Sequence, residues 1–246
     1  MNVVQSSERR QQSRADRRDA FLEATRQLIE ERGIDALTVK AVAERVDAAV
    51  GTLYTYFPSK GSLVAALQVE AIERLGASYA RAADNLDGDL AARDIDVDTA
   101  ALARLVAVGR SLIAVTEVHP EEFRLQQRLL NGQADYDDRD LALVVPVAFA
   151  VLARPERLLR DATALGLLEA GDSFDRTITW VAAINGVLTL GSLATPVADG
   201  FARTSLADML HLSLLRGWGA DPGLLAAAEA LVPLDGMAVL LRGDEP

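Results

Sequence analysis

The stretch from Gly51 to Lys60 reads GTLYTYFPSK and places three aromatic residues, Tyr54, Tyr56 and Phe57, within four positions. Only 5% of the 246 residues are aromatic, so this is a local concentration. Aromatic clusters usually belong to a core, yet this one is rich in hydroxyls and ends on one of only two lysines in the chain. The stretch therefore predicts a short helix with one buried side and one polar side.

Two short helices and a tight turn are expected around this stretch. Residues 39–46 place valines and an alanine on one face, and Thr38 is a good N-cap for that helix. A turn at residues 47–48 leads into a second helix over residues 49–56, where Leu53 can face inward. This is helix-turn-helix geometry, in which the second helix lies in the major groove of DNA.

The whole chain is predicted to be all-α. Alternating β-branched runs are absent, and Ala, Leu, Glu and Arg favour helices. We expect a disordered basic arm over residues 1–14, a helix-turn-helix DNA-binding domain over 15–60 that opens with a helix from about Ala15 to Arg32, and a larger helical ligand-binding and dimerisation domain over 61–246. Its helices are expected at about 60–85, 99–118, 121–131, 138–153, 156–169, 174–193, 204–217 and 222–231, followed by a frayed tail.

The charge is distributed unevenly. Residues 1–60 hold 10 basic and 9 acidic residues, a net charge of +1, whereas residues 61–246 hold 15 and 27, a net charge of −12. The body would repel a polyanion, and only the first quarter of the chain tolerates one. The chain has no cysteine, which fits a reducing cytosol, and its longest apolar runs are too short to span a membrane, so we expect a cytoplasmic protein without membrane contact.

The sequence TVKAVAERVDAAVGTLYTYFPSKGSL, Thr38 to Leu63, resembles the DNA-binding signature of the TetR-type (tetracycline-repressor-like) regulators. The resemblance covers residues 15–75 in detail. It implies a homodimeric repressor that binds a palindromic operator, with one helix-turn-helix per half-site. The residues that match the signature are Thr38, Ala43, Gly51, Thr52, Leu53, Tyr54, Phe57, Ser59, Lys60 and Leu63.

Three positions depart from this signature. Asp47 stands where the family has its turn glycine, Ala49 replaces the usual serine, and Tyr56 replaces the usual histidine. Aspartate tolerates left-handed backbone geometry better than most residues, so we expect the turn to survive. The departures and the acidic body leave open a second reading, a helical dimeric partner-binding or sensor protein with weak or lost DNA binding.

The resemblance places ten residues at the DNA. We expect Lys40 to read guanine and Lys60 to bind phosphate, while the small surfaces of Val50, Gly51 and Thr52 suit thymine methyl groups and close backbone approach. The predicted DNA-binding residues are Thr38, Lys40, Ala49, Val50, Gly51, Thr52, Tyr54, Thr55, Tyr56 and Lys60.

An arginine-rich arm precedes the motif, and two interpretations of it stay open. Its arginines can contact phosphates or a minor groove, or they can belong to a solvated disordered tail. The arginines in question are Arg9, Arg10, Arg14, Arg17 and Arg18.

The second domain carries candidate dimer and effector residues. Small residues and a leucine-rich face on the last two long helices suit either a two-fold four-helix interface or an intramolecular core. The dimer candidates are Ala183, Gly186, Val187, Gly191, Leu206, Met209, Leu210 and Leu214. The candidates for contact with a small, neutral or apolar effector, each of which can also be ordinary core or surface, are Phe123, Gln127, Phe149, Trp180 and Asn185.

Enzyme signatures are lacking. The two histidines, His119 and His211, are far apart in sequence, and neither a metalloprotease motif, a phosphate loop nor a nucleophile elbow is present. We therefore expect no catalytic residue, no cofactor and no metal site.

Overall fold

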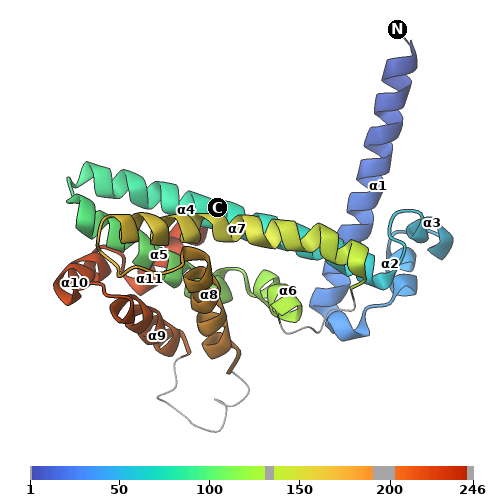
Figure 1. The fold of residues 1–246 in the computed structure, drawn as a ribbon. Coiled ribbons are helices and arrows are strands. Elements are labelled where there is room, and N and C mark those ends of the chain that lie inside the picture. Colours follow the sequence, from blue (N-terminus) through green and yellow to red (C-terminus); the bar gives the residue numbers. More distant parts are fainter. Residues whose placement is uncertain (1, 131–135, 191–202, 243–246) are drawn as a thin grey trace. The chain divides into compact units, whose positions relative to one another are not determined.

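The computed structural model describes residues 2–130, 136–190 and 203–242 (Figure 1). Within these ranges the chain forms α-helices and one short 3-10 helix, without a strand. The prediction of an all-α fold is therefore confirmed. The described residues group into two compact units, Met1–Ala71 with Arg128–Val147, and Ile72–Gln127 with Ala148–Pro246. This division falls within the fourth helix, after Ala71.

The first unit is built around the helix-turn-helix. It contains α1 (Asn2–Arg32), the 3-10 helix η1 (Ile34–Ala36), α2 (Val39–Arg45), α3 (Val50–Tyr54) and the start of α4 (Lys60–Ala92). One apolar cluster holds these elements together, and its largest side chains are Phe21, Leu22, Leu28, Leu53, Phe57, Leu63 and Leu67. Every one of these side chains is at most 3% exposed, so the unit has a core of its own.

The first helix is much longer than expected. It begins at Asn2, whereas the sequence predicted disorder over residues 1–14 and a helix start near Ala15. Residues 2–14 contain no glycine or proline and are rich in Gln and Arg, which have good helix propensity. Gln12 also donates a hydrogen bond of 2.8 Å to Asp16 one turn on.

The second unit surrounds a central helix. α5 (Val97–Val118) packs against α8 (Ser173–Thr189), α9 (Arg203–Gly217), α10 (Pro222–Leu231) and α11 (Leu234–Arg242). Helix α6 (Pro120–Leu130) follows α5 directly, and α7 (Asp138–Ala164) contributes Leu159 and Ala162 to the same core. By length and composition α5 is the one helix among the described residues that could cross a membrane, but 72% of its apolar window is buried, as expected of a core helix.

Three elements differ from the helices predicted for the second domain. Helix α4 continues to Ala92 instead of ending near residue 85, because Leu86 and Leu90 are buried. Residues 138–153 and 156–169 were expected to form two helices, but α7 continues through Pro146 and Pro155 to Ala164. Val144 and Leu159, each 0% exposed, anchor it on the two sides of these prolines, so burial outweighs the hydrogen bonds that the prolines cannot make. The predicted frayed tail instead forms α11, because Met237 and Leu241 are buried in the core.

A buried histidine joins three helices of the second unit. The Trp180 indole nitrogen donates a hydrogen bond of 2.9 Å to Nδ1 of His211, and the two rings stack at 5.2 Å. Burial lowers the pKa of His211 to about 4, so the ring is neutral at pH 7. Gly109 of α5 faces this ring, and a Cβ built there would come within 2.4 Å of it. The absence of a side chain at Gly109 therefore lets α9 approach α5.

Replacing Gly109 with alanine is expected to destabilise the protein by roughly 1–3 kcal/mol, because the added methyl group would overlap the His211 ring in a packed core. The matched control is Gly88→Ala in α4, where nothing lies within 4 Å of the new Cβ. This control should stabilise the protein by about 0.5–1 kcal/mol through helix propensity. Chemical denaturation of both variants measures the difference, and equal changes would contradict the proposed contact.

Candidate nucleic-acid interface

The turn between α2 and α3 is formed by backbone bonds and one strained residue. Thr38 caps α2, its hydroxyl accepting a hydrogen bond of 3.1 Å from the amide of Ala41. Asp47 adopts a φ of 50°, the left-handed geometry that the sequence predicted for it. The amide of Ala48 then donates to the carbonyl of Ala43 at 2.9 Å and closes the turn. The substitution of the family glycine by Asp47 thus leaves the turn intact.

Helix α3 is anchored on one side and exposed on the other. Leu53 is 0% exposed and Phe57 3% exposed, and both lie in the core of the first unit, as predicted. Gly51, Tyr54 and Thr55 are exposed. Val50 is 36% exposed and Tyr54 48% exposed, so apolar and aromatic surface faces solvent here. The exposed face of α3 is uncharged and has small residues at its start.

The hydroxyl groups predicted to contact DNA differ in how far they are already engaged in contacts within the protein. The Thr55 hydroxyl donates to the carbonyl of Thr52 at 2.7 Å, so its proton is already used within α3. Tyr56 is half-buried and its ring packs against Phe21 with centroids 5.5 Å apart, so it contributes to the core as well as to the surface. Tyr54 is the more exposed of the two tyrosines.

The two lysines have different surroundings. Lys40 lies on α2 with 77% of its side chain exposed, and its Nζ is 3.7 Å from a Glu44 oxygen one turn on. Lys60 is exposed at the start of α4. Ser59 and Ser62 cap that start reciprocally, each side-chain oxygen accepting a hydrogen bond of 2.9 Å from the other residue's amide. The predicted cap at Ser59 is therefore present.

Helices α1 and α2 are joined by an ion pair. Arg45 donates two hydrogen bonds to Glu31, of 2.8 and 2.7 Å, and this arginine holds the pKa of the Glu31 carboxyl below its usual range. Because both side chains are exposed, the pair orients α2 more than it stabilises the unit.

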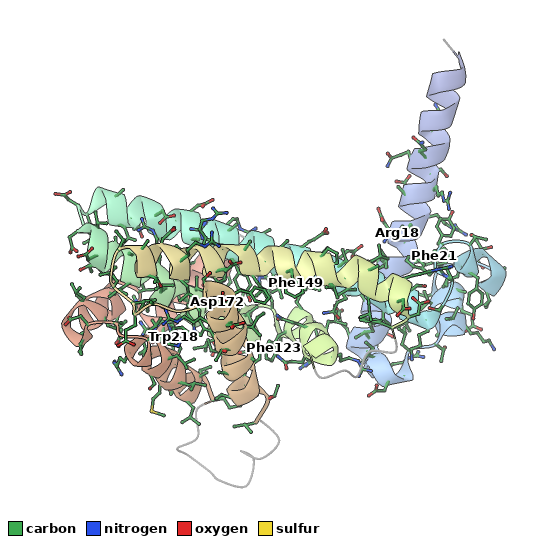
Figure 2. All side chains as sticks on the ribbon, in the orientation of Figure 1. Arg18, Phe21, Phe123, Phe149, Asp172 and Trp218 are labelled. Carbon is green, nitrogen blue, oxygen red and sulfur yellow. The ribbon has the colours of Figure 1, made fainter. Side chains whose placement is uncertain are left out.

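Arginines of α1 lie over the aromatic rings that the sequence singled out. The guanidinium carbon of Arg14 is 5.9 Å from the Tyr56 ring centroid, and that of Arg18 is 5.4 Å from the Phe57 centroid. Figure 2 shows Arg18 beside Phe21 on the part of α1 that enters the core. The sequence named these arginines but not the contacts. Their i, i+4 spacing would have shown that they share one helix face, whereas the rings beneath them come from the tertiary fold.

The five effector candidates all lie in the second unit, and the structure joins two of them. Gln127 of α6 donates a hydrogen bond of 2.6 Å to the Asn185 side-chain oxygen, and the Asn185 amide group donates to the carbonyl of Val181 at 2.8 Å. Phe123 packs against the core from α6. Trp180 is fully buried, whereas Phe149 is 47% exposed and stacks on Phe174 at 6.0 Å.

The dimer candidates on α8 and α9 are exposed or partly buried. Met209 is 57% exposed, Gly186 is exposed, and the others that can be described are intermediate: Ala183, Val187, Leu206, Leu210 and Leu214. Gly191 lies outside the described residues. The large side chains that fill the intramolecular core from these helices are instead Trp180, Ile184, Leu188, Leu212 and Leu215.

Comparison with known families finds a match for part of the first unit. Residues 21–67 match the family model described as "Bacterial regulatory proteins, tetR family". A repressor described as "HTH-type transcriptional repressor KstR" from Mycolicibacterium smegmatis is 42% identical over 81 residues, which are 33% of this chain and 40% of the relative. The likeness in sequence thus covers less than half of either protein.

Solved structures resemble a much larger share of the chain. A protein of unknown function from Rhodococcus sp. RHA1 covers 82% of this chain and 94% of its own, with a TM-score of 0.62 and 21% identity. The structure of RolR in complex with resorcinol covers 90% and 95%, with a TM-score of 0.56 and 18% identity. At these identities the likeness establishes the all-α fold alone.

Replacing Asp47 with glycine is expected to stabilise the protein by roughly 1 kcal/mol, because glycine adopts a positive φ without steric cost. Asp94 has a φ of 51° outside the helix-turn-helix, so Asp94→Gly should give a similar gain and serves as the reference. Asp47→Val should lose about 1–2 kcal/mol. Thermal unfolding measures all three, and a loss of stability in Asp47→Gly would show that the aspartate side chain itself holds the turn.

Proposed function

The first unit of this protein is a TetR-family DNA-binding domain, and from this premise we propose that the protein is a ligand-responsive transcriptional repressor. In this proposal a homodimer binds a palindromic operator in the cytoplasm, and a small, largely apolar molecule releases it. The relative that matches 81 residues of this chain is itself described as a transcriptional repressor, which supports regulation rather than catalysis.

The observation that carries the proposal is the exposed, uncharged face of α3 on its buried anchor. Leu53 and Phe57 hold the helix on the core, so its outer face can enter a major groove without rearrangement. Gly51 at the start of that face allows close approach of the backbone, and Val50 offers an apolar contact for a thymine methyl group. The absence of acidic side chains from α3 removes a source of repulsion from the phosphates.

The lysines on either side of α3 have separate roles in this proposal. Lys40 projects from α2 and would read the guanine edge, exchanging its contact with Glu44 for O6 and N7. Lys60 is exposed at the N-terminus of α4, where backbone amides and a cation together favour a phosphate. Base specificity would therefore depend on Lys40, and general affinity on Lys60.

The exposed apolar side chains of α8 and α9 support a two-fold interface. Ile178 is 39% exposed on α8 and Met209 57% exposed on α9, and α8 and α9 pack against each other within the unit. Two such helices from each subunit would form a four-helix interface. A palindromic operator requires this kind of symmetry, since each half-site binds one helix-turn-helix.

The effector is expected to bind in the second unit, near the hydrogen-bonded pair of Gln127 and Asn185. RolR, which shares the fold, has been solved with the small aromatic molecule resorcinol, and this supports a small effector here. Phe123 and Trp180 would supply apolar surface. The effector would act by preferring a conformation in which the two α3 helices no longer match the operator spacing.

The experiment that tests the whole proposal is the selection of bound duplexes from a random DNA pool, repeated with candidate small molecules. Enrichment of a palindromic sequence, lost on addition of one compound, is the expected result. If no sequence is enriched even at low salt, the protein would instead be a helical dimer that binds another partner.

Lys60→Ala is expected to weaken binding to all DNA sequences alike and to lower the salt slope, the dependence of log K on log salt concentration, by about one unit. Lys40→Ala is the matched lysine variant and should relax the base preference at one position per half-site, at a cost of about 1–3 kcal/mol. Binding titrations at several salt concentrations on selected and altered duplexes separate the two. If Lys60→Ala relaxed the base preference and Lys40→Ala lowered the salt slope, the roles assigned to the two lysines would be reversed.

Met209→Glu is expected to convert the dimer into monomers, because the substitution places a charge in the apolar two-fold contact. Val239→Glu is the control, since Val239 is 67% exposed on α11, away from the proposed contact. Sedimentation velocity gives the masses of both variants and of the unchanged protein. A dimer that persists in Met209→Glu would exclude α9 from the interface.

A further inference from the structure

One face of α1 carries a row of arginines beside the helix-turn-helix. With 3.6 residues per turn, Arg14, Arg17 and Arg18 fall on the same face as the buried Phe21. The acidic residues of this stretch, Asp16 and Asp19, fall on the opposite face. The row therefore lies on the side of α1 that packs on the core. Beyond the buried part of that side, the arginines give it a positive charge.

Each of these arginines lies over an aromatic ring. The distances from guanidinium carbon to ring centroid are 5.9 Å for Arg14 over Tyr56, 5.9 Å for Arg17 over Phe21 and 5.4 Å for Arg18 over Phe57. Contacts of this kind are attractive because the ring face is negative. Tyr56 and Phe57 directly follow α3, so the rings place Arg14 and Arg18 at the end of the proposed reading helix.

These arginines lack the acidic partners that Lys40, Arg45 and Arg26 have. Lys40 contacts Glu44, Arg45 binds Glu31, and Arg26 binds Glu70 at 3.0 Å. Among the residues that the structure describes, no carboxylate lies within ion-pair distance of Arg14, Arg17 or Arg18. In a chain of net charge −11, three neighbouring cations without acidic partners form an uncompensated positive surface.

We propose that Arg14 and Arg18 are a second phosphate-binding element, which grips the DNA backbone beside α3 while Tyr56 and Phe57 hold the two guanidinium groups in place. This inference rests on the proposed DNA-binding function and deepens it. A ring leaves the edge of a guanidinium free, and that edge presents the N–H groups that bind a phosphate in a bidentate manner. Stacking also limits the rotamers of these side chains in the free protein, so less ordering is required on binding.

The proposed contact is to phosphates, and it therefore adds affinity without sequence information. The contacts between these arginines and the aromatic rings also have an alternative, purely structural role, which is to stabilise the position of α1. The two roles differ in their measurable consequences. A purely structural role would alter the unfolding transition and leave the salt dependence of DNA binding unchanged, whereas a phosphate contact releases counterions.

The test is a titration of the full-length protein with its selected duplex at several salt concentrations. The double variant Arg14→Gln with Arg18→Gln is compared with the control Arg93→Gln with Arg242→Gln. The control changes the net charge equally at two exposed positions outside the first unit. In the first variant the salt slope should fall by about two units and the affinity at 0.1 M salt by roughly ten- to a hundred-fold, equally for all sequences. Circular dichroism verifies that both variants are folded.

The outcomes separate this inference from the function on which it rests. If the unchanged protein binds no duplex, the proposed function fails and the second phosphate site fails with it. If the unchanged protein binds and the two double variants behave alike, only the second phosphate site is overturned.

A lysine pair tests the part played by the planar guanidinium group. Arg14→Lys with Arg18→Lys keeps both charges, so the salt slope should remain near that of the unchanged protein. The affinity should still fall several-fold, because an ammonium group cannot bind a phosphate through a planar fork. Full recovery of affinity by the lysine pair would show that charge alone matters and would overturn the bidentate contact.

Discussion

The burial of Leu53 and Phe57 against Phe21 is the constraint on which the first unit depends. Helix α3 has only five residues, and a helix of that length is not stable by itself in water. Its position is set by two side chains that are almost completely removed from solvent. The exposed face of α3 is therefore not needed to hold the helix in place, which explains how small and uncharged residues can occupy it. It also brings Tyr56 and Phe57 within reach of the arginines of α1.

Local signals were sufficient to predict this part of the fold. Thr38 and Ser59 are residue types that cap helices, and Asp47 is one that accepts a positive φ. The spacing of Leu53 and Phe57 places both on one side of the helix. Each of these features can be predicted from residues close together in the sequence. The ring contacts of Arg14 and Arg18 could not be predicted in the same way, because their partners lie some forty residues further along the chain. Only the tertiary packing of α1 against the segment that follows α3 brings them together.

The errors in the predicted fold arise where tertiary packing overrides the local sequence signals. Local propensity predicts a helix boundary at Pro155 and a frayed tail, but Leu159 and Met237 are buried, and their burial outweighs local propensity. In the second unit the decisive interactions join distant helices. Arg110 of α5 binds Asp208 of α9 through two hydrogen bonds of 2.9 and 3.0 Å and also reaches the carbonyl of Glu229 in α10. The contacts of Arg110 with α9 and α10 cannot be predicted from any periodicity in the sequence.

The polar contacts of α8 restrict what the proposed effector can be. Asn185 is only 7% exposed, and its side chain is satisfied on both sides, by Gln127 and by the carbonyl of Val181. A molecule that displaced Gln127 without replacing its hydrogen bond would leave a buried amide oxygen unpaired, at a cost of about 1–3 kcal/mol. An effector that uses this site must therefore combine an apolar body with at least one hydrogen-bond donor. A purely apolar molecule would bind elsewhere in the unit or leave the pair intact.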